Sequence, residues 1–213
     1  ISNEQIISIE KLVNKEIKEI KLLSSSFNIN CIKILTSNKK NFIVKFYKSK
    51  YKNFNAIKSE IDNLIYLNKL NLNSFPKVYT EDRNYLIMSF LNNDGNQPNE
   101  TKQDLLKAII SLHSCSNDKY GFNFDTQIGG LKQINKKNEN WVDFYRNNRL
   151  GYIYEIINIA EPMDYSINKK IELLMKKMEE FIPKNPKISL LHGDLWEGNI
   201  LFKKNNFVGF IDP

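Results

Sequence analysis

The spacing of hydrophobic and polar residues changes several times in the first half of the chain. Ser2 and Gln5 have the spacing of a helix capping box ahead of an apolar pattern with helical spacing at residues 6–13, which predicts an amphipathic helix. Three runs with the character of β-strands follow, at residues 17–22, 31–36 and 42–47. Their short polar connections predict an antiparallel meander, with Ser24 to Asn28 breaking the first strand.

A helical pattern and a second hairpin complete this half. Residues 55–70 have helical spacing, with Glu60 on or near the apolar face. Residues 77–79 and 85–91 are predicted to pair across a polar turn at 81–84. We therefore expect five strands and one further helix before residue 92.

The polar stretch at residues 92–98 predicts a linker, because it combines Asn, Asp, Gly and Pro. Beyond it the pattern is mostly helical, at residues 101–114, 139–159 and 166–181, with a short strand at 188–191 and a hairpin of residues 200–202 and 207–211. We expect an α+β fold with an N-terminal lobe at 1–91 and a mostly helical lobe at 99–213.

Composition excludes several classes of protein. No run approaches the roughly 18 apolar residues of a membrane helix, and Cys31 and Cys115 are too few for a disulfide framework. The net charge is +7, but lysines are dispersed rather than clustered in a basic patch. We therefore expect a monomer in the reducing cytoplasm, with neither membrane nor nucleic acid as a partner.

A short motif near the C-terminal end carries the candidate chemistry. His192, Asp194 and Asn199 have the H-x-D-x-x-x-x-N spacing of the catalytic loop in kinase-like phosphotransferases, and Asp212 follows on the next hairpin. In this interpretation Asp194 accepts the proton of the attacking hydroxyl. Asn199 and Asp212 supply oxygen ligands to Mg²⁺ beside the phosphates of ATP.

The N-terminal half contains residues that complement this motif. Lys45 lies on the third predicted strand, where kinases place the lysine that neutralises the α- and β-phosphates, and Glu60 on the next helix is placed to pair with it. Met88, Ser89, Phe90 and Leu91 precede the linker, at the hinge position of a two-lobed kinase. We expect main-chain groups of Ser89 to Leu91 to bind adenine, with Met88 lining the pocket.

Two histidines have simpler interpretations. His113 follows Leu112 on an apolar helix face, and we interpret it as a residue of the core. His192 is expected to shape the catalytic loop by hydrogen bonding, with Asp194 as the base.

The sequence resembles the fructosamine kinases, also called ketosamine-3-kinases, of the aminoglycoside-phosphotransferase branch. Residues 192–199 are similar to the family motif H-G-D-L-W-x-G-N, and Trp196 separates them from antibiotic and choline kinases. Further similarities lie in F-I-V-K at 42–45, the segment from Tyr120 to Gly129, the helix from Trp141 to Leu150, and I-D-P at 211–213.

This resemblance implies a two-lobed protein-kinase-like fold that uses ATP and Mg²⁺ to phosphorylate a sugar hydroxyl of ketosamines, free or bound to proteins. Ser25, Ser26 and Phe27 would lie over the nucleotide, although the family has glycines there, and Trp196 and Trp141 would line the substrate pocket. Because family members continue beyond the point matching Pro213, the resemblance also implies that a helical segment is missing from the C-terminal lobe.

Two alternatives remain open. The chain could be another kinase of the same branch, acting on an amino sugar, choline or homoserine, which Trp196 argues against. It could also be a nucleotide-binding pseudokinase, suggested by the missing glycines and opposed by the intact Asp194, Asn199 and Asp212.

Overall fold

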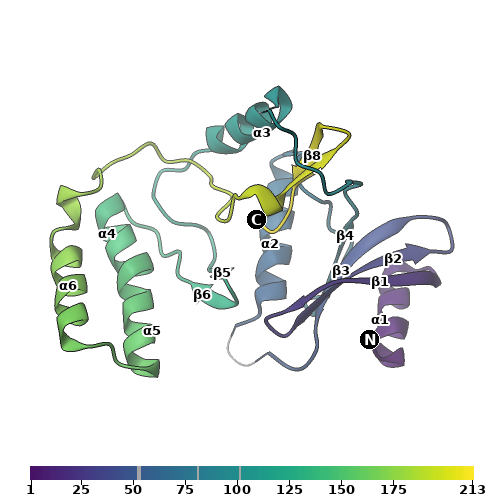
Figure 1. The fold of residues 1–213 in the computed structure, drawn as a ribbon, viewed down its shortest axis with the longest axis horizontal. Coiled ribbons are helices and arrows are strands. Elements are labelled where there is room, and N and C mark those ends of the chain that lie inside the picture. Colours follow the sequence, from purple (N-terminus) through teal and green to yellow (C-terminus); the bar gives the residue numbers. More distant parts are fainter. Residues whose placement is uncertain (52–53, 81, 101) are drawn as a thin grey trace. The chain divides into compact units, whose positions relative to one another are not determined.

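The computed structural model describes residues 1–51, 54–80, 82–100 and 102–213 (Figure 1). The chain divides into two compact units, one formed by Ile1–Leu112 with Leu191–Pro213 and the other by His113–Leu190. The predicted lobes at 1–91 and 99–213, with a linker at 92–98, have different boundaries from these two units. The division into lobes stays a prediction.

A four-stranded antiparallel sheet forms the centre of the first unit. Its strands lie in the order β1 (Ile17–Ser26), β2 (Ile29–Thr36), β3 (Asn41–Tyr47) and β4 (Tyr85–Ser89) (Figure 1). The predicted meander is therefore confirmed. Each strand pairs with its neighbour along the chain, as short connections require.

The prediction of a fifth strand was wrong for the described residues. Val78 makes only an isolated bridge to Met88, supported by a bond from the Tyr79 N–H to the Ile87 carbonyl at 2.7 Å. The predicted pairing is present but too short to form a strand, and Glu81 in the connection lies outside the described residues.

The prediction that Ser24 to Ser26 break the first strand was also wrong. These serines belong to β1 and pair with β2, after a register irregularity between Leu22 and Ser24. Only Phe27 and Asn28 form the turn, with φ of 46° and 63°. Positive φ at both central residues is the geometry that closes a two-residue hairpin, and it allows the strand to continue to the turn.

Two helices lie on opposite faces of the sheet (Figure 1). On one face, Ile9 of α1 (Asn3–Val13) joins a buried cluster with Val44 and Phe46. The predicted capping box at its start is confirmed. Residues alternate across a strand, so Lys45 points to the other face, where α2 (Ala56–Lys69) presents its buried side.

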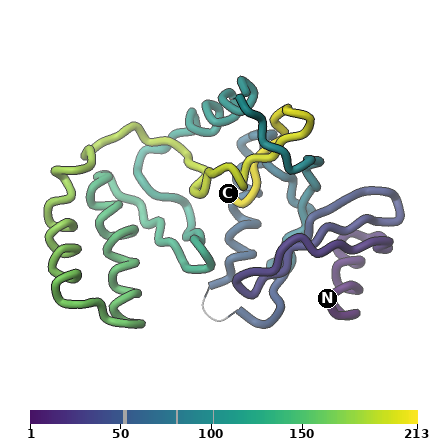
Figure 2. The backbone as a smooth tube through the Cα atoms, viewed as in Figure 1, coloured from purple at the N-terminus to yellow at the C-terminus, as the bar shows by residue number. Residues whose placement is uncertain are grey.

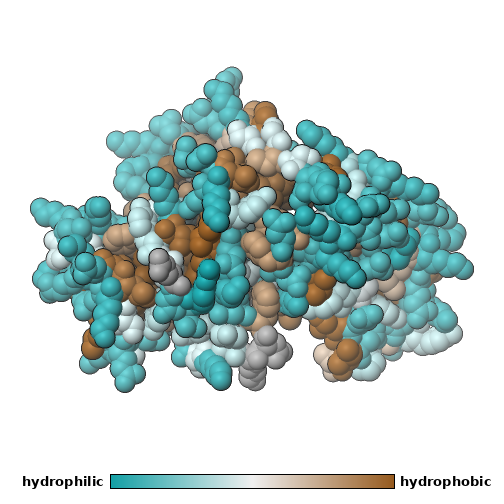
Figure 3. All heavy atoms as spheres, turned by 180° about the vertical axis from the view of Figure 1, so that it is seen from behind, coloured by the Kyte–Doolittle hydropathy of each residue, from teal (hydrophilic) through white to brown (hydrophobic). Residues whose placement is uncertain are grey.

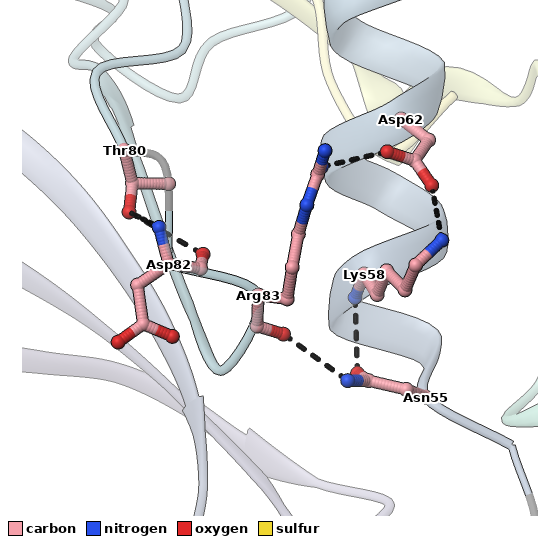
Figure 4. Close-up of polar contacts among 6 residues, drawn as sticks. All are labelled: Asn55, Lys58, Asp62, Thr80, Asp82 and Arg83. Atoms are coloured by element: carbon pink, nitrogen blue, oxygen red, sulfur yellow. Dashed lines mark hydrogen bonds and ion pairs between the residues drawn. The ribbon is translucent and has the colours of Figure 1, made fainter.

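A polar network fixes the start of α2 (Figure 4). Asn55 caps the helix by accepting from the Lys58 N–H at 3.0 Å, and its amide donates to the Arg83 carbonyl at 3.1 Å. Asp62 accepts from both Arg83 and Lys58 at 2.7 Å. These bonds join the first turns of α2 to the segment entering β4, which restricts movement of the helix that carries Glu60.

The predicted linker is bonded to the C-terminal hairpin of β7 (Ile200–Lys203) and β8 (Asn206–Phe210). Asp94 accepts from the Lys204 N–H at 2.8 Å, and the Gln97 amide donates to the Glu197 and Ile200 carbonyls. The tube in Figure 2 shows the C-terminal segment running among earlier parts of this unit. Residues far apart in sequence thus form one body.

Helix α3 (Gln103–Ser114) crosses the boundary between the units, and the predicted helix start, Thr101, lies outside the described residues. The second unit holds a small hairpin and several helices. Its elements are β5 (Thr126–Ile128), β6 (Leu131–Gln133), α4 (Trp141–Tyr145), a π-helical segment η1 (Arg146–Gly151), α5 (Tyr152–Ala160), α6 (Tyr165–Lys176) and a 3₁₀ turn η2 (Met178–Glu180).

Two predictions for this unit need correction. The helix predicted at 139–159 is interrupted by η1, and its first residues, 139 and 140, precede α4. The strand predicted at 188–191 is not formed. The described contacts there are single bonds, from the Leu190 N–H to the Cys115 carbonyl and from the Ser116 hydroxyl to the Ile188 carbonyl, rather than a ladder.

The surface is mixed in character. In Figure 3 hydrophilic side chains cover most of the visible face, and hydrophobic ones gather in patches between them. No helix within the described ranges is long and apolar enough to cross a membrane.

Candidate active site

The side chain of Lys45 lies at the centre of the candidate site. Its Nζ donates to Glu60 Oε1 at 2.7 Å and to Asp212 Oδ1 at 2.6 Å, and only 12% of the side chain is exposed. The structure thus brings Lys45 and Glu60 together as the sequence predicted. The bond to Asp212 was not predicted, because no local pattern links residues so far apart.

Opposite charges in this cluster shift one another's pKa values toward the charged forms. Burial lowers the pKa of Lys45, but the carboxylates of Glu60 and Asp212 more than offset this effect, so the pKa stands above its ordinary value. Burial raises the pKa of Glu60, and the charge of Lys45 opposes that rise. Lys45 therefore stays protonated beside two acidic side chains. Glu60 is buried, whereas the Asp212 side chain is 44% exposed.

The catalytic-loop motif forms a compact turn. Asn199 is buried, and its Nδ2 donates to the Asp194 carbonyl at 2.9 Å and to Asp194 Oδ2 at 3.1 Å. Gly193, the residue before Asp194, has a φ of 94°, a backbone conformation that favours glycine. The Asp194 side chain is exposed, so a substrate hydroxyl can reach the carboxylate while the amide of Asn199 holds it in place.

His192 supports this turn from inside. Its ring is buried between Phe75 and Phe210, with ring centroids 5.8 Å away in both cases. Its Nδ1 accepts from the Asp194 N–H at 3.4 Å, and burial lowers the pKa of the imidazole. The expected hydrogen bond in the loop is therefore present, although it is long. His113, predicted as a core residue, is half-buried.

Asp212 and Asn199 could hold a metal ion together. The Ile211 N–H donates to the Asn199 carbonyl at 3.0 Å, which joins the segments carrying the two residues. The Asn199 amide nitrogen faces Asp194, so its oxygen is the atom left for a cation. No group of three or more His, Cys, Asp or Glu side chains suited to a metal occurs among the described residues. One carboxylate and one amide fit Mg²⁺ that takes its other ligands from phosphates and water.

Trp196 is 57% exposed and lies against Gly198. A Cβ at Gly198 would clash with the Trp196 ring, so the indole can lie here because residue 198 has no side chain. Trp141 belongs to the second unit, where it stacks on Phe144 and contacts Tyr120. The roles of both tryptophans in a substrate pocket stay predictions.

The predicted adenine segment lies at the end of β4. Met88 is buried, as expected for a residue lining a pocket. The Ser89 N–H donates to the Lys77 carbonyl at 2.8 Å, so it is already engaged within the sheet. Phe90 follows the strand and lies under the Lys33 ammonium, 4.0 Å from its ring centroid.

The serine hairpin has two different faces. Ser24 is opposite Cys31, and Cys31 is opposite Lys45, so these three residues share the face of the charged cluster. Ser26 shares it by alternation, whereas Ser25 points to the other face and donates to Asn30 Oδ1 at 2.8 Å. The register across β1 to β3 distinguishes Ser24 from Ser25, and the roles of Ser25, Ser26 and Phe27 at a nucleotide stay predictions. Phe27 at the turn is 73% exposed.

Comparisons with known proteins identify the family of the chain. The family described as fructosamine kinase matches residues 3–213. A protein-ribulosamine 3-kinase of Arabidopsis thaliana is 35% identical over 133 residues, which cover 61% of this chain and 40% of the relative. A probable ketoamine kinase of Pasteurella multocida is 32% identical over 175 residues, covering 79% of this chain and 59% of the relative. The chain thus spans about half the length of these curated relatives.

Solved structures establish the fold. A putative fructosamine-3-kinase from Thermobifida fusca superposes with a TM-score of 0.82 at 19% identity, covering 100% of this chain and 74% of that one. Aminoglycoside phosphotransferases have the same fold, with TM-scores of 0.65 to 0.68. The predicted α+β, protein-kinase-like fold is therefore confirmed.

Proposed function

The chain belongs to the fructosamine kinase family, and from this premise we propose that it transfers the γ-phosphoryl group of ATP to a sugar hydroxyl of a ketosamine. The observation that carries the proposal is the convergence of Lys45 with Glu60 and Asp212, in the same unit as a loop in which Asn199 holds the Asp194 carboxylate. Phosphoryl transfer depends mainly on positioning and on neutralising charge, and these residues provide both.

Each residue has a distinct role in this mechanism. Lys45 binds the α- and β-phosphate oxygens, and Glu60 keeps its ammonium in place. Asp194 orients the acceptor hydroxyl and takes its proton, a contribution of about 10²- to 10⁴-fold. Asn199 and Asp212 would hold Mg²⁺, and the ion would supply positive charge to neutralise the phosphates.

The adenine is bound by the main chain after β4. Because the Ser89 N–H is engaged by Lys77, we assign the adenine contacts to Phe90 and Leu91, with Met88 lining the pocket. The Lys33 ammonium lies over the Phe90 ring and stabilises the position of that side chain by a cation–π interaction.

The serine hairpin takes the place of a glycine-rich loop. Ser24 and Ser26 lie on the face of Lys45 and can offer hydroxyl donors to phosphate oxygens, whereas Ser25 stabilises the hairpin through Asn30. Phe27 lies at the turn and covers the nucleotide.

The substrate class rests on the family. The relatives' names specify a protein-bound ribulosamine and a ketoamine, so we assign ketosamines, free or on proteins, as acceptors and repair of glycated amines as the role. Trp196 is our candidate for the sugar contact. The predictions of a cytoplasmic monomer without a nucleic-acid partner stay predictions.

The test is a phosphorylation assay with a panel of acceptors. Purified protein with Mg-ATP is offered a fructosamine, a ribulosamine, an aminoglycoside, choline and homoserine, and Asp194→Asn serves as the control for each. Phosphorylation confined to the two ketosamines, and lost in the variant, supports the proposal. Transfer mainly to another acceptor, or Mg-ATP binding without any transfer, overturns it in favour of a different kinase or of a pseudokinase.

A further inference from the structure

Asp212 has a backbone conformation that needs support from its surroundings. Its φ of 58° lies in the left-handed region, which costs free energy for a residue other than glycine. A metal ligand in such a conformation is directed correctly only while the chain on both sides is held in place. The question is therefore which contacts hold residues 210–213.

Two contacts hold the chain before Asp212. The Phe210 N–H donates to the Ser74 carbonyl at 2.7 Å, and the Ile211 N–H donates to the Asn199 carbonyl at 3.0 Å. They fix the approach to Asp212, and neither of them involves Pro213.

Within the described ranges, one side chain is hydrogen-bonded to the chain after Asp212. Asn63 is half-buried on α2, and its Nδ2 donates to the main-chain oxygen of Pro213 at 2.8 Å. One turn earlier on the same helix, Glu60 bonds Lys45, which in turn bonds the Asp212 carboxylate. Helix α2 thus reaches the Asp212 carboxylate through Lys45 and holds the main chain of the next residue, Pro213, through Asn63.

We propose that Asn63 is a positioning residue for Asp212, which fixes the backbone after the metal ligand and so sets the affinity of the nucleotide site for Mg²⁺. This inference rests on the proposed function, because it takes Asp212 as a metal ligand. In this proposal Asn63 acts through the Pro213 main chain rather than by binding metal or substrate itself.

The test compares two asparagines of α2. Asn63→Asp keeps the size of the side chain but replaces the donor with a carboxylate that repels the Pro213 oxygen. The matched control is Asn68→Asp, because Asn68 is also half-buried on α2 and its Nδ2 donates to a proline carbonyl, that of Pro76, at 3.1 Å. ATP binding is measured by calorimetry with Mg²⁺ varied, and again in EDTA.

In Asn63→Asp we expect the Mg²⁺ concentration for half-maximal ATP binding to rise about three- to tenfold, the worth of one hydrogen bond to a positioned group. ATP affinity in EDTA should be unchanged, and Asn68→Asp should keep the Mg²⁺ requirement of the unchanged protein. Equal losses with and without Mg²⁺, or an unchanged Mg²⁺ requirement, overturn the proposal.

Asn63→Ala is the second variant if the aspartate prevents folding, with the same expectation and the same contrary outcomes. Transfer to ketosamines is measured separately. If the unchanged protein binds ATP with Mg²⁺ but transfers nothing, the proposed function fails and the calorimetric comparison still decides the role of Asn63. If its ATP binding does not depend on Mg²⁺, the positioning role fails as well.

Discussion

The Lys45 cluster and the 192–199 loop belong to the same unit but are held in place by different forces. In the cluster, Lys45 and Glu60 are buried and meet through opposite charges. In the loop, the Asp194 side chain is exposed. Its carboxylate accepts a hydrogen bond from the Asn199 amide, and its main-chain N–H donates to the His192 ring. The comparison indicates that the cluster contributes to stability in addition to its proposed role in nucleotide binding, whereas Asp194 can be changed with little structural cost.

The strongest test of this contrast is Asp194→Asn. The substitution keeps size and shape but removes the base, so turnover of the ketosamine should fall about a hundredfold or more. ATP affinity and the thermal midpoint should stay close to those of the unchanged protein, because the side chain is exposed. Steady-state kinetics, calorimetry with ATP and thermal unfolding measure the three quantities. Near-normal turnover would show that Asp194 is not the catalytic base.

The second test examines the cluster through stability. Glu60→Ala leaves the buried Lys45 with Asp212 as its remaining carboxylate partner, and the free energy of unfolding should fall by about 2 to 3 kcal/mol. Lys58→Ala is the control, because Lys58 pairs with Asp62 on the same helix but is 53% exposed. It should cost less than about 1 kcal/mol. Denaturant unfolding measures both, and equal costs would contradict the contrast.

The sequence allowed the candidate residues to be named, but only some of the contacts among them could be predicted. Lys45, Asp194, Asn199 and Asp212 follow from motif spacing and from order along the chain. The pairing of Lys45 with Glu60 follows because a helix after a strand returns across it. The bond between Lys45 and Asp212 depends on how the last hairpin lies within the first unit, which no local pattern records.

The errors in the fold have a similar origin. A run of three serines resembles a break, but Phe27 adopts a positive φ that its residue type disfavours, and β1 continues to the turn. The hairpin of β5 and β6 was missed although Gly129 and Gly130 form a two-residue turn between its strands, a signal that sequence reasoning could have used. The interruption of the predicted helix by η1 has no signal that we recognise.

A third test concerns the exposed side of the loop. Gly198→Ala places a methyl group where the Trp196 ring lies, so the indole must move while Asn199 keeps its bonds. We expect the KM for the ketosamine to rise several-fold and the KM for ATP to stay unchanged. Tryptophan fluorescence in a Trp141→Phe background reports the movement of Trp196 directly. A shifted indole with an unchanged ketosamine KM would remove Trp196 from the substrate pocket.

The smallest effect that we expect concerns Cys31, on the same face as Lys45. Burial raises the pKa of its thiol to about 11, Lys45 opposes the rise, and the carboxylates of Glu60 and Asp212 add to it. A raised pKa means less thiolate: at pH 8 the ratio of thiolate to thiol is about a thousandth, compared with roughly a third for a cysteine with the ordinary pKa of about 8.5. Alkylation of Cys31 by iodoacetamide, followed by mass spectrometry of its peptide, should therefore be slow at neutral pH. Its rate should increase about tenfold per pH unit until the pH approaches the pKa.

Glu60→Gln sharpens this last test. It removes one of the negative charges that raise the pKa of Cys31 and keeps the size of the side chain, so the pH profile of alkylation should move to lower pH. Asp194→Asn is the control, because Asp194 is not among the groups that shift this thiol. Rapid alkylation of the unchanged protein at neutral pH would show that the thiol is not shielded as its burial requires. An identical profile in both variants would show that the charge of Glu60 does not affect the pKa of Cys31 on the neighbouring strand. The electrostatic effect of the cluster would then be confined to its own residues.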